Sequence, residues 1–322
     1  MASGMMIEGK WITNANKSDK RGKFNEIPTT FRNRVSTDGN GFFKAEAGRY
    51  HLYVSLGCPW AHRTIIVREL KGLNDAISVG IVDPIMSNNG WMFSDASGTF
   101  PDTVNHAQYL QEIYLKAAPK YTGRITVPVL WDRHFATIVN NESREIMRMF
   151  DIEFAELATR NIDLYPRDLQ QKIDQTIDAI YPINAGVYHA GFATSQAAYE
   201  QAVTKLFERL DRWENVLSLQ RYLCGNQLTE ADICLFTTLY RFDAVYYGHF
   251  KCNLRRIIDY PNLWNYLKDL YQRPEFKVTC NLDDIKRGYY MSMTEINPNR
   301  IVPKGPIIDF DEPHDRLRIE FE

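Results

Sequence analysis

Apolar and polar residues alternate along the chain from about residue 50 to residue 56. The apolar positions of this run are Leu52, Val54 and Leu56. A repeat of two residues is typical of a β-strand. The run that follows, from residue 59 to residue 70, has the spacing of an amphipathic helix. The pattern therefore predicts a strand, a turn at Cys58 and a helix that begins at Pro59.

Three further strand-like runs lie at residues 76–82, 125–132 and 134–141. The last two are close enough in sequence to predict a hairpin. A proline inside a strand-like run, here Pro128, indicates an edge strand or a special peptide bond. A cis bond between Val127 and Pro128 would point backbone groups outward for a ligand.

Two stretches between these runs are candidates for ligand contacts. Residues 83–121 form a connection that is too long to be idle in a compact domain. Glu142 and Ser143 stand where a helix is expected to begin, and free N–H groups with a hydroxyl at such a start suit a carboxylate. A plain helix cap is the alternative interpretation of this pair.

From about residue 164 the pattern is helical, with almost no strand signal. One long amphipathic helix is predicted from Thr194, with a single apolar stripe. The stripe comprises Val203, Leu206, Phe207, Leu210, Trp213 and Leu217. Thr229 and Asp232 have the spacing of a capping box, so a buried helix is expected to begin there.

These patterns predict an α/β domain at residues 48–152, a linker at 153–163 and an all-helical domain at 164–296. Residues 1–47 are expected to form an extended arm that packs over the first domain. Residues 297–322 carry several prolines and are expected to lie extended on the surface. A chain of 322 residues is long enough for two domains with separate cores.

The composition is that of a globular protein, with 44% hydrophobic and 24% charged residues. A formal charge of -2 gives no general attraction to nucleic acid. No run approaches the ~18 apolar residues of a membrane helix, and the N-terminus lacks an apolar signal core. The sequence therefore predicts a cytoplasmic protein with neither nucleic acid nor membrane as a partner.

The absence of several sequence motifs argues against several kinds of reaction and binding site. The five cysteines are an odd number and show no C-x-x-C spacing, so neither a disulfide framework nor a zinc site is indicated. The seven histidines form no H-E-x-x-H pair. There is no Walker-type lysine loop and no G-x-S-x-G elbow, which argues against nucleotide and serine-nucleophile mechanisms.

Cys58 has the setting of a reactive thiol. Pro59 suits the first helical position, so the thiol would lie beside unpaired N–H groups and the positive end of the helix dipole, which favours a thiolate. A thioredoxin-type dithiol enzyme carries a second cysteine three positions on, where this chain has Ala61. An adduct on Cys58 would then need an outside thiol for its release, and glutathione is the most available one. The alternative is a buried, inert cysteine.

Several stretches together resemble the xi-class glutathione transferases, the glutathionyl-hydroquinone reductases. They are FKAEAGRYHLYVSLGCPWAHRTIIVRELKGL (43–73), YTGRITVPVLWD (121–132), TIVNNES (137–143), NAGVYHAGFA (184–193), IKRGYYMSMTEINP (285–298) and IVPKGP (301–306). The resemblance runs from about Phe24 to Pro306. It implies a thioredoxin-like N-terminal domain that binds glutathione, an all-α C-terminal domain, the aromatic substrate in the cleft between them, and a homodimer.

The resemblance also implies a reaction in which glutathione is a co-substrate and no metal takes part. A glutathionyl-hydroquinone and glutathione would give the hydroquinone and glutathione disulfide, through a mixed disulfide on Cys58. Tyr188 matches the proton donor and acceptor. Tyr246 and Tyr289 match tyrosines that help keep the cysteine ionised.

The substrate contacts follow from the same resemblance. Tyr188, Tyr289 and Tyr290 match positions that bind the aromatic substrate. The positions that match the glutathione site are Trp91, Arg124, Ile125, Thr126, Val127, Glu142 and Ser143. Because tyrosines are adjacent at 246 and 247 and at 289 and 290, which member of each pair faces the site stays open.

Two other functions also stay open. An omega-type thiol transferase or dehydroascorbate reductase would use the same cysteine, although Tyr188 and the GYYMS stretch favour cleavage of a thioether. Transferase-like domains also serve as non-catalytic binding modules. The joint presence of Cys58, Arg124 and the Glu142-Ser143 pair argues against a binding module, while any one of the tyrosines or Trp91 taken alone is as compatible with packing.

Overall fold

A mixed sheet lies at the centre of the first half of the chain. The structure, a computed structural model, describes residues 4–13, 18–37, 41–95 and 99–319. Within them, four strands pair in the order β6-β5-β7-β8. The strands are β5 (Tyr50–Val54), β6 (Ile77–Ile81), β7 (Val129–Asp132) and β8 (Thr137–Asn140). β5 is parallel to β6 and antiparallel to β7, which pairs antiparallel with β8, so the predicted strands and hairpin are confirmed.

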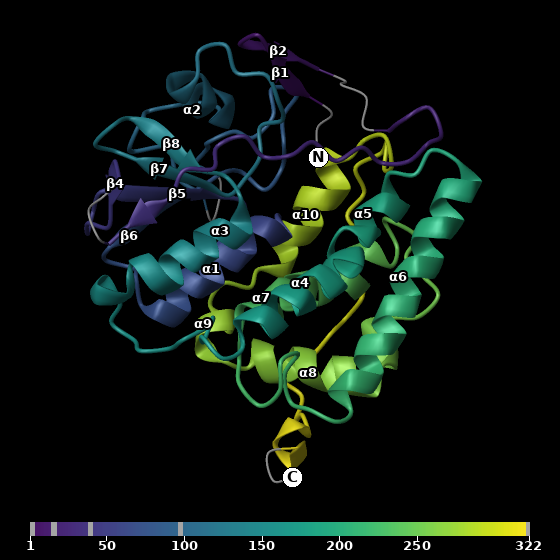
Figure 1. The fold of residues 1–322 in the computed structure, drawn as a ribbon. Coiled ribbons are helices and arrows are strands. Elements are labelled where there is room, and N and C mark those ends of the chain that lie inside the picture. The colour runs from purple at the N-terminus through teal and green to yellow at the C-terminus, as the bar shows by residue number, and fades with distance from the viewer. Residues whose placement is uncertain (1–3, 14–17, 38–40, 96–98, 320–322) are drawn as a thin grey trace. The chain divides into compact units, whose positions relative to one another are not determined.

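Helices cover both faces of this sheet. They are α1 (Pro59–Lys71), α2 (Leu110–Ala117) and α3 (Ser143–Arg148), which continues as a π-helix at Met149–Glu153 and a 3-10 turn at Ala155–Leu157. In Figure 1, α1 and α3 lie side by side below the sheet and α2 lies above it. Helix α2 was not predicted from the sequence, because it has only eight residues and lies within the long connection 83–121.

The N-terminal extension adds two short sheets. Its strands are β1 (Met5–Ile7), β2 (Lys10–Ile12), β3 (Val35–Ser36) and β4 (Phe43–Lys44), paired β1 with β2 and β3 with β4. Met6 and Gly123 exchange backbone hydrogen bonds of 2.8 and 3.0 Å, which fixes the first hairpin to the loop before β7. Residues 1–3, 14–17 and 38–40 of the predicted extension, and 320–322 of the predicted tail, lie outside the described residues.

The second half of the chain is helical. Its elements are α4 (Gln170–Asn184), α5 (Gly186–Gly191), α6 (Gln196–Leu217), α7 (Glu230–Arg241), a π-helix at Phe242–Tyr246, a 3-10 turn at Ile257–Asp259, α8 (Pro261–Tyr271), α9 (Pro274–Lys277), α10 (Leu282–Ser292) and a 3-10 turn at Arg316–Ile319. All six residues of the predicted stripe on α6 are buried. Every residue of α7 is buried, and its capping box joins Thr229 to Asp232 as predicted.

The chain divides into two units, each made of three segments. Unit 1 takes the described residues of Met1–Asn16, Glu26–Ile162 and Asp283–Val302. Unit 2 takes those of Lys17–Asn25, Asp163–Leu282 and Pro303–Glu322. The extension contributes to both units, and α10 belongs to unit 1. The domain boundaries drawn from the sequence remain predictions. No helix among the described residues has both the length and the hydropathy to cross a membrane.

The C-terminal tail is not wholly on the surface: that prediction was wrong for Phe310 and Arg316, which are buried, while 311–313 and Asp315 between them are exposed. Phe310 is buried against the rings of Tyr240, Trp264 and Tyr271. Arg316 is fully buried, and its guanidinium donates to the backbone oxygens of Leu217, Gln220 and Arg221 at 2.6 to 2.8 Å. A buried cation at the C-terminal end of α6 satisfies carbonyls that have no partner within the helix.

We expect Arg316→Gln to lower the free energy of unfolding by about 2–4 kcal/mol, because several buried carbonyls lose a charged donor. Arg318→Gln is the control, since Arg318 is half-exposed and pairs mainly with the exposed Asp315. Denaturant unfolding of the two variants measures the difference. Equal losses of stability would contradict a structural role for the buried tail.

Candidate active site

Cys58 lies at the junction of β5 and α1, as the sequence predicts. It is the N-cap of α1, with φ -82 and ψ 120, and Pro59 is the first helical residue. Its backbone N–H donates to Ser55 O at 3.1 Å, and its carbonyl accepts from His62 N at 3.0 Å. The side chain is half-buried. The thiol thus belongs to the first turn of a helix, where backbone N–H groups favour negative charge.

The loop before β7 lies beside this sulfur. Cys58 Sγ is 3.5 Å from Val127 O and, as a thiol, donates a hydrogen bond to it. The Val127–Pro128 peptide bond is cis and β7 lies between β5 and β8, so of the two alternatives indicated by Pro128 the special peptide bond is the one observed. β7 begins only at Val129, so residues 124–127 form a loop and not the start of the strand. The structure therefore brings one predicted glutathione-binding residue into contact with the predicted nucleophile.

The other cysteines lie in different surroundings. Cys224, Cys234 and Cys252 are buried, and Cys280 is half-buried. Burial raises the pKa of the Cys280 thiol to about 12 and raises the pKa values of Cys224 and Cys252 as well. A thiol with a raised pKa is protonated at neutral pH and is a poor nucleophile.

A buried hydroxyl stands at the start of α3. Glu142 is the N-cap of this helix, and its carboxylate accepts from Arg144 N and from Thr29 Oγ1, both at 3.3 Å. Ser143 Oγ is buried and has no hydrogen-bond partner in the described part of the chain. Because Glu142 makes the cap, the Ser143 hydroxyl is not needed for it. A buried hydroxyl without a partner costs free energy, which points to a ligand group at this place.

The loop 124–127 has two half-buried and two buried residues. Arg124 is half-buried, and removal from water lowers the pKa of its guanidinium. The side chains of Ile125 and Val127 are buried, so any contact with a ligand would come from their backbone. Thr126 is half-buried, and its backbone N–H and C=O both bond to the Tyr114 hydroxyl.

Trp91 lies in the long connection and is also largely buried, with 6% of its surface exposed. Its carbonyl accepts from Leu110 N at 3.0 Å, which ties the connection to the start of α2. The backbone of Trp91 thus holds the connection against the start of α2.

Two of the predicted tyrosines meet in unit 2. The hydroxyl oxygens of Tyr188, on α5, and Tyr246 are 3.4 Å apart, and both rings are buried. Phe250 stacks on Tyr246 and packs edge-on against Tyr188. Tyr247 is half-buried, so Tyr246 is the member of its pair that lies with Tyr188.

The other predicted tyrosines lie on α10 in unit 1. Tyr289 is buried, whereas Tyr290 is half-buried. Helix α10 packs closely on the segment after β6: a Cβ at Gly288 would lie 2.9 Å from Pro84 O, and Met86 N donates to Ser292 Oγ at 2.9 Å. Glycine at position 288 therefore permits the approach that places these tyrosines.

The predicted site residues divide between the units. Unit 1 holds Cys58, Trp91, Arg124, Ile125, Thr126, Val127, Glu142, Ser143, Tyr289 and Tyr290, and unit 2 holds Tyr188 and Tyr246. Tyr114, whose hydroxyl bonds to the backbone of Thr126, was not predicted from the sequence. Tyr114 is buried on the short helix α2, and no motif in the sequence around it indicates a functional residue. Among the described residues, no three His, Cys, Asp or Glu side chains form a group that could hold a metal ion.

Comparisons with known proteins identify the family to which both halves of the chain are similar. The family profile "Glutathione S-transferase, N-terminal domain" matches residues 57–152, and "Glutathione S-transferase, C-terminal domain" matches residues 196–269. Glutathionyl-hydroquinone reductase YqjG of Escherichia coli is 52% identical over 97% of this chain and 98% of that protein. These matches confirm the predicted fold class.

Two solved structures are similar over almost the whole chain. The xi-class glutathione transferase of Natrialba magadii has a TM-score of 0.93 and 52% identity, covering 99% of this chain and 98% of its own. The glutathione-bound structure of YqjG has a TM-score of 0.89 and 50% identity, covering 98% of this chain and 99% of its own.

We expect Cys58 to be alkylated before any other cysteine near neutral pH. Limited iodoacetamide followed by peptide mapping should show labelling of Cys58 at least about tenfold faster than Cys280, since only a thiolate reacts. Labelling of Cys280 should keep rising as the pH approaches its raised pKa. Cys58→Ser is the control and should remove the fast phase. Equal labelling of both cysteines in the wild type would contradict the proposed reactivity.

Proposed function

The chain belongs to the xi class of the glutathione transferases, and on that basis we propose that it is a glutathionyl-hydroquinone reductase. It reduces S-glutathionyl-hydroquinones to hydroquinones, with glutathione as co-substrate and glutathione disulfide as second product. The observation that carries the proposal is the placement of Cys58 at the N-cap of α1, half-exposed and 3.5 Å from Val127 O. With Ala61 where a second cysteine would stand, an external thiol must complete the cycle.

The reaction proceeds in two exchanges at sulfur. The Cys58 thiolate attacks the glutathione sulfur of the substrate, and the bond from that sulfur to the ring carbon breaks. The ring carbon takes the electron pair and a proton, which gives the hydroquinone and leaves a Cys58–glutathione disulfide. A second glutathione thiolate attacks the glutathione sulfur of this disulfide, releases glutathione disulfide and restores Cys58.

Three tyrosines supply the acid–base chemistry in this proposal. A ring carbon is a poor leaving group unless it is protonated as the bond breaks, and Tyr188 is the proposed donor. The Tyr246 hydroxyl, 3.4 Å from that of Tyr188, supports it through a hydrogen bond. Tyr289 and Tyr246 are proposed to stabilise the ionised cysteine, and Tyr290 to contact the aromatic substrate together with Tyr188 and Tyr289.

Glutathione is held by loops of unit 1. We assign Ser143 and Glu142 to the γ-glutamyl end, because the buried Ser143 hydroxyl has no partner in the described part of the chain. Val127 pairs by its backbone with the tripeptide, close to the sulfur that reacts. Arg124 can pair with a carboxylate.

The remaining predicted contacts act less directly in this proposal. The buried side chains of Ile125 and Trp91 shape the walls of the site. Thr126 fixes the position of the loop, since its backbone is bonded to the Tyr114 hydroxyl.

A second candidate is an omega-type thiol transferase or dehydroascorbate reductase. It would use Cys58 in the same way, but exchange between sulfurs needs no proton donor for carbon. The buried pair of Tyr188 and Tyr246 hydroxyls therefore favours the thioether reaction. A non-catalytic binding module is disfavoured, because Cys58 is half-exposed at a helix N-cap, where backbone N–H groups favour a reactive thiolate.

The proposal extends to the setting of the enzyme. A homodimer follows from the family resemblance, and light scattering of the purified protein tests it. A cytoplasmic location suits a reaction that consumes reduced glutathione. Neither a metal nor nucleic acid has a role in the proposed chemistry.

Turnover of glutathionyl-menadiol should exceed turnover of a glutathione mixed disulfide or of dehydroascorbate, measured at equal concentrations with glutathione in excess. Cys58→Ser should abolish all three activities. Tyr188→Phe should lower the thioether reaction at least about a hundredfold, in the range of general acid catalysis, and leave disulfide exchange almost unchanged. Equal loss of both activities in Tyr188→Phe, or preference for the disulfide in the wild type, would favour the omega-type function.

Ser143→Ala should weaken the binding of glutathione by about tenfold or more without lowering stability. The lost hydrogen bond to a charged ligand reduces affinity, while in the free protein the removed hydroxyl had no partner to lose. The matched control is Ser78→Ala, because Ser78 Oγ lies 2.6 Å from His51 Nδ1 and accepts from Arg133 Nη2 at 2.6 Å.

Calorimetric titration with glutathione measures the affinity of each serine variant, and denaturant unfolding measures its stability. The Ser143 variant should lose affinity and keep its stability. The Ser78 variant should lose stability and keep its affinity for glutathione. A Ser143→Ala protein that is less stable but binds glutathione normally would contradict the assignment.

A further inference from the structure

One buried hydroxyl joins the two loops to which glutathione binding is assigned. Tyr114, on α2, is fully buried. Its hydroxyl donates to Thr126 O at 2.8 Å, and it accepts from Thr126 N at 3.2 Å and from Asn141 Nδ2 at 3.1 Å. A phenol has one donor and two acceptor sites, so its capacity is fully used. The loop 124–127 is thereby tied to the residue just before the Glu142-Ser143 pair.

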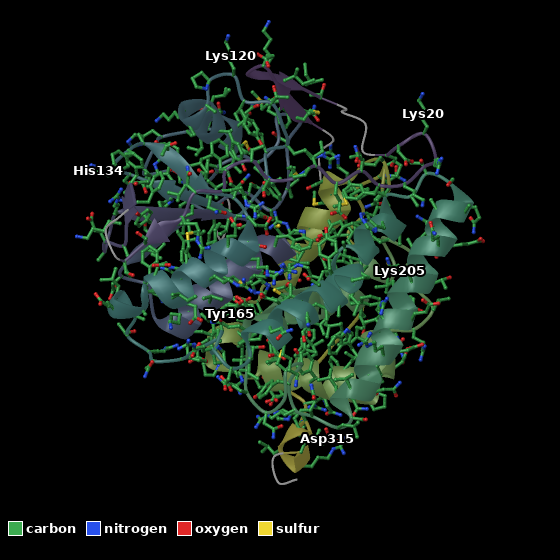
Figure 2. The ribbon with its side chains drawn as sticks, in the orientation of Figure 1. Lys20, Lys120, His134, Tyr165, Lys205 and Asp315 are labelled. Carbon is green, nitrogen blue, oxygen red and sulfur yellow. The ribbon has the colours of Figure 1, made fainter. Side chains whose placement is uncertain are left out.

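A second tyrosine holds the same loop from its other end. Tyr121 is buried, and its hydroxyl donates to Arg124 O at 3.0 Å. The Tyr114 and Tyr121 rings are 5.0 Å apart. The neighbouring Lys120 is exposed and points outward (Figure 2), so the turn places one residue in solvent and the next beneath the loop. Both ends of 124–127 are thus fixed by tyrosine hydroxyls.

The N-terminal extension completes this cluster. The Phe31 ring lies 5.7 Å from the rings of both Tyr114 and Tyr121. Its backbone N–H donates to Asn141 Oδ1 at 3.2 Å, and its carbonyl accepts from Asn141 N at 3.1 Å. Two residues earlier, Thr29 donates to the Glu142 carboxylate. The extension therefore contacts the same two loops that the tyrosines hold.

We propose that Phe31, Tyr114 and Tyr121, here called the aromatic brace, are positioning residues that hold loop 124–127 and the Glu142-Ser143 pair in the spacing that glutathione requires. None of the three needs to touch the ligand. The N-terminal extension is then a structural part of the glutathione site and not a gate over it. The inference rests on the proposed function, because it takes these two loops as the glutathione site.

The geometry explains why such a brace would matter. Val127 is adjacent to Thr126, and its carbonyl contacts Cys58 Sγ. A shift of the loop would therefore misplace a glutathione sulfur relative to the nucleophile, and misplacement of about 1 Å is enough to lower reaction rates strongly. Burial raises the pKa values of Tyr114 and Tyr121, so both hydroxyls remain protonated and able to donate across the physiological range.

The first test compares Tyr114→Phe with Tyr50→Phe in the full chain. The Tyr50 hydroxyl donates to Lys44 O at 2.7 Å and is also on a fully buried ring in unit 1, but Lys44 lies in β4 and not in either loop. Tyr114→Phe should lose more stability than Tyr50→Phe, because the Tyr114 hydroxyl makes three hydrogen bonds and the Tyr50 hydroxyl makes one. Tyr114→Phe should weaken binding of S-methylglutathione, a thioether that has no aryl group to release and therefore does not react, by about tenfold, and Tyr50→Phe by less than about twofold.

A second pair of variants tests the extension without altering a tyrosine. Phe31 and Phe43 are both half-buried on the extension, and each makes an edge-on ring contact, Phe31 with Tyr114 and Phe43 with Phe135. Phe31→Ala should raise the KM for the glutathionyl substrate severalfold with a smaller change in kcat, while Phe43→Ala should leave KM unchanged. This pair keeps the proposal testable if Tyr114→Phe fails to fold.

The possible results distinguish a failure of the aromatic brace from a failure of the proposed function. If the wild type binds S-methylglutathione and Tyr114→Phe matches Tyr50→Phe in affinity, or Phe31→Ala matches Phe43→Ala in KM, the brace is overturned and the proposed function stands. If the wild type does not bind S-methylglutathione, the proposed function is overturned and the brace with it. A loss of affinity confined to the Tyr114 and Phe31 variants supports the brace.

Discussion

The sulfur of Cys58 is fixed between two pieces of backbone: the first turn of α1, which it caps, and the loop carbonyl of Val127. The helix start offers N–H groups that favour a thiolate, and the loop brings any ligand paired with it to the sulfur. Because Ala61 replaces a second cysteine, the adduct formed there cannot be resolved within the loop. The need for an external thiol, and therefore for a glutathione site beside the cysteine, follows from this arrangement.

The proposed glutathione site in unit 1 is made of two segments that other parts of the unit hold in place. Loop 124–127 and the Glu142-Ser143 pair flank the β7–β8 hairpin, whose ladder pairs Leu130 with Asn140 and stops short of both segments. Buried tyrosine hydroxyls and a segment of the N-terminal extension connect them instead. The Ser143 hydroxyl is buried without a hydrogen-bond partner in the described part of the chain, and we propose that a ligand completes the network there. In the proposed arrangement, the hydrogen bonds and ring contacts of the brace stabilise the two loops, and the Ser143 hydroxyl is left to bind the ligand.

The sequence predicted the features that depend on local periodicity or on a single residue type. The strand before Cys58, the stripe on α6 and the capping box at Thr229 each depend on residues a few positions apart, and all were confirmed. The features it missed depend on distant contacts. Tyr114 bonds to Thr126 and Asn141, and Arg316 to carbonyls about a hundred residues earlier, so neither shows in a local pattern. The short helix α2 was missed because two turns give too little periodicity to detect.

The most direct test of the central claim is intact-mass measurement after one equivalent of glutathionyl-menadiol is mixed with the wild type in the absence of free glutathione. The proposed mechanism predicts release of menadiol together with one glutathionyl group on the protein, located on Cys58 by peptide mapping, lost on addition of glutathione and absent in Cys58→Ser. Release of menadiol without an adduct, or an adduct on another cysteine, would contradict it.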